Sequence, residues 1–212
     1  MWELVKAGGW LMLPLVLCSI FTVAITIERF IRLKKSMILP KALLINQTQN
    51  ADVVMQQLQQ DKALQSSTLG RIFAAGYQSK SKNEQYARAQ METTASQEIG
   101  YLEKNINFLG TLSAVAPLLG LLGTVLGIIE SFLVIDLGTN SNPTLMIPGI
   151  SKALITTAAG MFIAIPALFA YRYFQRLVQE YVAELEQQST LFHAALFYQN
   201  SIDEEHDIRK AG

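Results

Sequence analysis

The serine and threonine hydroxyls are the side-chain groups of this sequence whose spacing best indicates a functional site. Two uncharged stretches set serine and threonine among small residues at spacings of three and four, which places them on one face of a helix. The first face holds Ser113, Pro117, Gly120, Thr124, Gly127 and Ser131, and the second holds Gly149, Ala153, Thr157, Gly160, Ala164 and Ala167. In a membrane, such a face packs closely against another helix or lines a polar lumen.

Thr124 and Thr157 are expected at the same depth in the membrane. The uncharged stretches are centred near Leu118 and Phe162. At about 1.5 Å of rise per residue, Thr124 lies roughly 9 Å outside its centre and Thr157 roughly 8 Å outside its own. A single threonine commonly bonds the carbonyl one turn earlier on its own helix, which implies no function. Two at matching depth favour a polar lining for a pore or a partner helix.

Glycines and prolines complete the two faces. Gly123 and Gly127 have the Gly-x-x-x-Gly spacing that allows close helix approach. Pro117 and Pro166 each remove a helical hydrogen bond and can bend their helices. The predicted site comprises the pathway residues Thr124, Thr157, Thr156, Ser113 and Ser131, the outer-mouth pair Glu130 and Lys152, and the packing or bending residues Pro117, Gly120, Gly123, Gly127, Gly160 and Pro166.

The composition argues against several classes of protein. Half of the residues are apolar, and 17 basic residues balance 17 acidic ones, so nothing favours nucleic-acid binding. No phosphate-binding loop, paired carboxylates or nucleophile beside a histidine is present, so we expect neither an enzyme nor a cofactor. His193 and His206 lack companions, which argues against a metal site. The middle of each expected span holds no acid or base, so a proton relay needs a group from a second protein.

Three apolar stretches predict an all-α, polytopic membrane protein. Each is near the roughly 20 residues that a helix needs to cross hydrocarbon. Basic residues follow the first and third stretches, and Lys104 precedes the second, which places these flanks in the cytoplasm. The expected segments are a periplasmic N-terminus at 1–7, transmembrane helices at 8–27, 105–135 and 150–171, a cytoplasmic helical insert at 28–104, a periplasmic loop at 136–149, and a cytoplasmic helix and tail at 172–212.

Helical patterns continue beyond the second and third spans. Residues 83–105 contain no proline and only Gly100 as a helix breaker, so the second transmembrane helix is predicted to extend into the cytoplasm. After the third span, Tyr181, Leu185 and Phe192 share one apolar face. Such a face is explained equally well by packing within one subunit and by association between copies of the chain.

The residues become recognisable when the two faces are read together. The stretch APLLGLLGTV at 116–125, followed by GISKALITTAAG at 149–160 and AIP at 164–166, closely resembles the ExbB and TolQ branch of the MotA/TolQ/ExbB proton channel family. This resemblance covers residues 107–176, while the first span with Glu28-Arg29 and the helical insert agree in layout. Flagellar MotA stators are more distant, since they have four spans.

The resemblance implies a machine of several proteins in the bacterial inner membrane. A homo-pentamer would surround a lumen that holds a dimer of an ExbD- or TolR-like protein with one transmembrane helix per copy. The aspartate of that partner carries the proton, and Thr124 and Thr157 occupy the positions of lumen-facing threonines near it. Inward proton flow would drive work on a TonB- or TolA-like envelope-spanning protein, for outer-membrane transport or envelope maintenance.

Lys152 departs from the family pattern, which usually has glutamate at this position. Exchanging a carboxylate for an ammonium reverses the local field on cations. We expect Lys152 to pair with Glu130 or with a partner carboxylate, and conduction to persist. Two alternatives stay open, a non-conducting membrane scaffold whose glycine faces only assemble other proteins and a sodium-coupled stator. Ion flux in vesicles distinguishes the scaffold from the motor.

Overall fold

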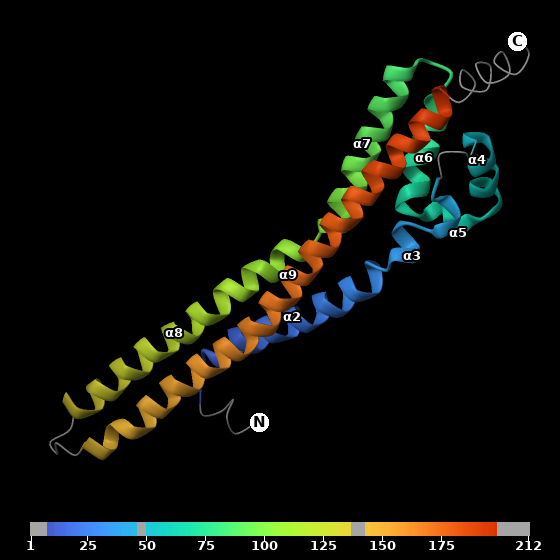
Figure 1. Cartoon of the computed structure of the whole chain (residues 1–212). Coiled ribbons are helices and arrows are strands. Elements are labelled where there is room, and N and C mark those ends of the chain that lie inside the picture. Colours follow the sequence, from blue (N-terminus) through green and yellow to red (C-terminus); the bar gives the residue numbers. More distant parts are fainter. Residues whose placement is uncertain (1–7, 46–49, 137–142, 199–212) are drawn as a thin grey trace, which may run out of the picture. The chain divides into compact units, whose positions relative to one another are not determined.

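The computed structural model describes residues 8–45, 50–136 and 143–198, and every regular element in these ranges is a helix (Figure 1). The all-α prediction is therefore confirmed for the described residues. The expected N-terminal segment at 1–7, residues 137–142 of the loop expected at 136–149, and His206 lie outside them. The elements are α2 (Met12–Arg32), α3 (Lys35–Ile38), η1 (Lys41–Leu43), α4 (Ala51–Gln60), α5 (Lys62–Ser66), α6 (Thr68–Ser79), α7 (Glu84–Glu103), α8 (Ile106–Asp136), η2 (Pro143–Met146) and α9 (Ile147–Phe197).

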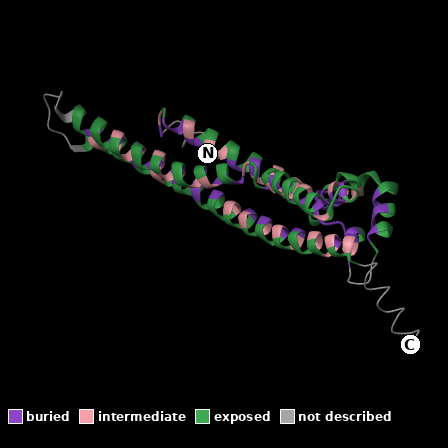
Figure 2. Cartoon of the chain, turned by 90° about the horizontal axis from the view of Figure 1, so that it is seen from above, coloured by how far each residue is buried: buried purple, intermediate pink, exposed green. Residues whose placement is uncertain are grey.

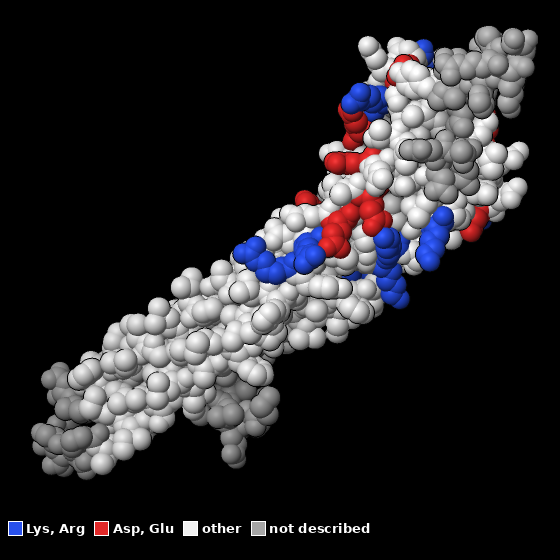
Figure 3. Space-filling model, in the orientation of Figure 1, with Lys and Arg blue, Asp and Glu red and all other residues white. Residues whose placement is uncertain are grey.

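The chain divides into two compact units. The span unit consists of Met1–Arg29 and Asn105–Gln175, and the insert unit consists of Phe30–Lys104 and Arg176–Gly212. The three helices long and apolar enough to cross a membrane include α2, α8 and α9, as predicted. On the face drawn in Figure 3, the described surface of α8 is formed almost entirely by uncharged side chains.

The three long helices of the span unit meet in a small apolar core. Met12 and Leu15 of α2 pack with Ala116 of α8 and Ala164 of α9. Many large apolar side chains elsewhere on these helices are exposed, Phe162 by 77%, and exposed residues recur along the long helices in Figure 2. So much exposed apolar surface on one chain is typical of a protein that lipid or further chains cover.

The second span does not continue as one helix into α7, so this prediction was wrong. α7 ends at Glu103 and α8 begins at Ile106. Between them, Asn105 has φ of 63°, in the left-handed region that asparagine tolerates better than most residues. The third span does continue, because α9 is a single helix of 51 residues.

Polar residues start the helices of the insert unit. Asn50, Asp61, Ser67 and Asn83 each accept a hydrogen bond from a backbone N–H in the first turn of α4, α5, α6 and α7, respectively. Such N-caps contribute about 1 kcal/mol each, since they satisfy donors that the helix leaves unpaired. These caps explain why short helices alternate with polar junctions in this part of the sequence.

Aromatic stacking joins α6 and α9 within the insert unit. The rings of Phe73 and Phe192 stack with centroids 4.1 Å apart, and both side chains are fully buried. Tyr181 is also buried and donates a hydrogen bond to the carbonyl of Leu33 at 3.0 Å. Packing within one chain thus accounts for the apolar face of α9 beyond the third span, which is one of the two explanations left open by the sequence.

Replacing Phe192 by alanine is expected to destabilise the insert unit by about 3–5 kcal/mol, because it removes a fully buried ring and leaves Phe73 without its stacking partner. Amide hydrogen exchange measured in detergent should accelerate across α6 and the C-terminal half of α9. Val53→Ala, at a half-exposed position on α4, is the control and should leave exchange unchanged. Equal protection in both variants would contradict this role for the stack.

Candidate functional site

Glycines allow the backbones of α8 and α9 to touch within the span unit. A Cβ atom added at Gly120 would lie 3.0 Å from the carbonyl oxygen of Thr156 and from Cα of Thr157. One added at Gly160 would lie 2.6 Å from the carbonyl oxygen of Ala116. The distance at Gly160 is shorter than real Cβ contacts, so only glycine fits there with the helices this close, and a Cβ atom at Gly120 would require its neighbours to move by a few tenths of an ångström.

The contact continues toward the ends of the helices that are joined through η2. A Cβ atom at Gly123 would overlap Oγ1 of Thr156, and one at Gly127 would lie 2.8 Å from the Cβ of Ala153. The same addition at Gly149 would overlap the hydroxyl of Ser131. The small-residue faces of α8 and α9 therefore pack against each other inside one chain. Helical periodicity alone could not identify which surface each face contacts.

Two of the predicted pathway hydroxyls lie inside this contact. Thr156 is 1% exposed and donates to the carbonyl of Ala153 at 2.8 Å. Ser131 is 2% exposed, and its hydroxyl lies 2.8 Å from the carbonyl oxygen of Gly127 and 3.3 Å from that of Met146. In this arrangement neither side chain is accessible to a lumen outside the α8–α9 pair.

The other three predicted pathway residues are partly accessible. Thr157 donates to the carbonyl of Gly120 at 2.9 Å, across the gap between α9 and α8. Thr124 and Ser113 donate to carbonyls of their own helix, at 2.6 Å and 2.7 Å. The bond from Thr157 places it at the level of Gly120, so Thr124, four residues further along α8, lies about 6 Å away along the helix axis, more than the equal depth expected from the sequence.

Glu130 and Lys152 form the ion pair expected from the sequence. Lys152 Nζ lies 2.8 Å from Glu130 Oε2, and the two side chains are 29% and 51% exposed. The pair joins α8 to α9 on the outer side of the threonines in the expected topology. Because Glu130 is half exposed, burial alone gives this pair no large contribution to stability.

A polar cluster joins α2 to the start of α8, which reasoning from the sequence missed. Arg29 is 2% exposed, and its Nη2 lies 3.1 Å from Glu28 Oε1. The other carboxylate oxygen of Glu28 accepts a hydrogen bond from Asn105 Nδ2 at 3.1 Å. Burying an arginine is costly unless a carboxylate accompanies it, so the adjacent Glu28-Arg29 pair was the available signal.

The prolines interrupt neither helix. Pro117 lies within α8 and Pro166 within α9, and both helices run through them. Each helix lacks one hydrogen bond at its proline, because proline has no backbone N–H. Whether this loss bends the helices for function stays a prediction.

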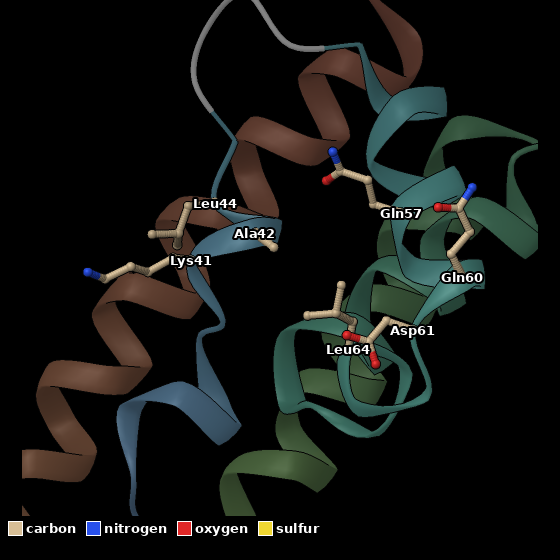
Figure 4. Close-up of a pocket in the computed structure, with 7 residues that line it drawn as sticks. All are labelled: Lys41, Ala42, Leu44, Gln57, Gln60, Asp61 and Leu64. Carbon is tan, nitrogen blue, oxygen red and sulfur yellow. The ribbon is translucent and has the colours of Figure 1, made fainter.

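The described residues outside the span unit offer no stronger site. An open hollow of about 500 Å³ in the insert unit is lined by polar and apolar side chains from η1, α4 and α5 (Figure 4). Its carboxylate, Asp61, already accepts the hydrogen bond from Ala63 that starts α5. No group of three or more potential metal ligands occurs among the described residues.

Gly123→Val is expected to destabilise the span unit by about 1–3 kcal/mol or more, because the new side chain must occupy the space of Thr156. The midpoint of thermal unfolding in detergent should fall. Ala114→Val adds the same kind of side chain at an exposed position of α8 and serves as the matched control. A Gly123→Val protein as stable as this control would show that α8 and α9 do not touch here.

Comparison with known proteins agrees with this geometry. Residues 64–187, more than half of the chain, match the MotA/TolQ/ExbB proton channel family. A Synechocystis protein whose name describes it as an ExbB-like biopolymer transport protein is 32% identical over 206 residues, which cover 91% of this chain and 78% of that relative. The Tol-Pal system protein TolQ of Haemophilus influenzae is 36% identical over 111 residues, 50% of this chain and 49% of TolQ.

The biopolymer transport protein ExbB of Salmonella typhimurium is 40% identical over 85 residues, 40% of this chain and 35% of that protein. The family consists of channel and transport components, and its match includes the α8–α9 contact, the threonines and the ion pair. The resemblance seen in the sequence is confirmed. With three apolar helices, tightly packed α8 and α9, and relatives of this kind, the chain belongs to the MotA/TolQ/ExbB proton channel family.

Proposed function

We propose that this chain is the ring-forming channel subunit of a bacterial inner-membrane motor that converts proton-motive force into mechanical work. The observation that carries the proposal is the hydroxyl of Thr157, which donates a hydrogen bond to the carbonyl of Gly120, one turn from Thr124, in a span unit whose middle contains no carboxylate, histidine, lysine or arginine. Family membership supports a channel, and the described chain supplies polar groups without supplying a proton carrier.

The hydrogen bonds of the two threonines determine what they can offer a partner. A hydroxyl has one hydrogen to donate and two lone pairs to accept with. The hydroxyls of Thr157 and Thr124 both donate their hydrogen to backbone carbonyls, so their oxygens can only accept further hydrogen bonds. A protonated carboxyl on a neighbouring helix can donate to such an oxygen. Because low dielectric favours the neutral form of an acid, this arrangement suits a carboxyl that carries protons through the membrane.

The exposed apolar surface of α8 and α9 requires a cover. Leu118 of α8 and Phe162 and Phe169 of α9 are all more than half exposed in the single chain. We assign this surface to neighbouring copies, lipid and the lumen partner. The assembly is a homo-pentamer around a dimer of an ExbD- or TolR-like single-span protein, whose aspartate reaches Thr124 and Thr157.

The expected topology completes the proposal. The N-terminus and the connection between α8 and α9 lie in the periplasm, and the insert unit lies in the cytoplasm, where basic residues flank the spans. The output acts on a TonB-like or TolA-like protein that reaches the outer membrane. Relatives named as biopolymer transport and Tol-Pal system proteins support an envelope role of this kind.

A passive scaffold is a weaker explanation than the sequence alone allowed. Its basis was that glycine faces could hold other proteins, whereas Gly120, Gly123 and Gly160 lie against the partner helix of the same chain. Surfaces already used within the chain cannot also recruit a second protein.

The whole complex should conduct protons only with an intact partner carboxylate. Vesicles that contain this chain and its single-span partner are loaded with a pH-sensitive dye, and a pH gradient is imposed. Flux is expected in the native complex and should be lost when the partner aspartate becomes asparagine. The same vesicles with a sodium gradient distinguish proton from sodium coupling. An assembled complex that carries neither ion would establish the scaffold and reject the motor.

Thr157→Val should lower this flux by about tenfold or more, because one hydrogen bond worth about 1.5 kcal/mol is lost where the ion passes. Thr157→Ser keeps the hydroxyl and is expected to retain most of the flux. Lys152→Glu restores the residue usual in the family and should also conduct. Wild-type flux in the valine variant would count against the threonine role, and a silent Lys152→Glu complex would show that the ammonium itself is needed.

A further inference from the structure

The chain ahead of α2 lies against the outer ends of α8 and α9 in the span unit. We refer to residues 8–11 as the N-terminal clasp. Gly8 is buried, and a Cβ atom there would be 3.4 Å from the methyl carbon of Thr156. Leu11 is 5% exposed, and the backbone turns into α2 through a hydrogen bond from Met12 N to Gly9 O of 3.1 Å.

Gly9 supports the side chain of Lys152 at this point. Gly9 has φ of 73°, a conformation that favours glycine. A Cβ atom on Gly9 would overlap Cε of Lys152 and lie 2.9 Å from its Nζ. The aliphatic part of the lysine therefore passes directly over the glycine Cα on its way to Glu130, which it reaches at 2.8 Å.

The space around this contact is nearly filled. A cavity of about 10 Å³ lies between the clasp, Glu130 and Lys152, with Thr156 and Gly123 in its lining. This volume holds about one water molecule. Lys152 therefore has little room beside the clasp, and its position depends on the absence of a side chain at residue 9.

We propose that Gly9 is a positioning residue that holds Lys152 on Glu130 and thereby sets the charge at the outer mouth of the channel. This inference rests on the proposed function. While the pair is closed, the ammonium neutralises the carboxylate of Glu130. When Lys152 is displaced, Glu130 presents a free negative charge that raises the local concentration of entering cations.

The effect of Gly9→Ala follows from which atoms the new methyl group meets. They belong to the far end of a flexible side chain, so the lysine can move aside. Alanine at φ of 73° also strains the backbone of the clasp, so Lys152→Met, which removes the ammonium and leaves Gly9 in place, separates loss of the ion pair from that strain. Gly100→Ala, where a Cβ atom meets nothing within 4 Å, controls for replacing a glycine without a new contact.

Chemical labelling tests the contact without any measurement of ion flux. The purified complex is treated briefly with an amine-reactive reagent, and modification of Lys152 is quantified by mass spectrometry. Gly9→Ala should raise the labelling rate of Lys152 several-fold, and Gly100→Ala should leave it unchanged. Labelling of the Gly9→Ala protein at the wild-type rate, with a wild-type midpoint of unfolding, would overturn the proposal.

Ion flux then tests the consequence. Gly9→Ala and Lys152→Met should each lower the proton concentration that gives half-maximal flux, and by similar factors. The double variant should match Lys152→Met alone, because both changes act through the same ion pair. Additive effects would show that Gly9 acts by another route. Absence of flux in the unmodified complex would reject the proposed function and leave the labelling result as a separate test of the clasp.

Discussion

Close approach of helices in a medium without water is the constraint on which the span unit depends. In hydrocarbon no hydrophobic force drives helices together, so van der Waals contact and internal hydrogen bonds must hold them. Gly120 and Gly160 bring the backbones of α8 and α9 together, and the bond from Thr157 to Gly120 becomes possible only at that separation. The same contact encloses Thr156 and leaves Thr124 partly accessible, so backbone packing decides which hydroxyls are free to act.

Two clusters of charged side chains lie near opposite ends of the described span unit. Lys152 meets Glu130 at one end, while Arg29 and Asn105 share Glu28 at the other. Each cluster joins two helices. The first cluster joins α8 to α9 and the second joins α2 to the start of α8, so α8 has a polar contact near each end and glycine contacts with α9 between them.

Much of this arrangement could be predicted from the sequence, for identifiable physical reasons. Length and absence of charge located the three spans, and helical spacing found the small-residue faces, because both depend only on local sequence. The partner of those faces could not be predicted, since periodicity describes one helix at a time. The interruption at Asn105 was missed because a single asparagine in the left-handed region resembles any helical polar residue. The contact between Gly9 and Lys152 could not be predicted, because the two residues are far apart in the sequence and no local sequence pattern indicates it.

The two long helices of the span unit differ in how they leave it. α9 runs unbroken from Ile147 to Phe197, short of one hydrogen bond at Pro166, whereas α8 is separated from α7 at Asn105. A continuous helix resists twisting about its own axis, whereas a non-helical joint between two helices allows one helix to rotate relative to the other. α9 therefore leaves the span unit with a stiff backbone, whereas the chain that enters α8 has a joint immediately before its first turn.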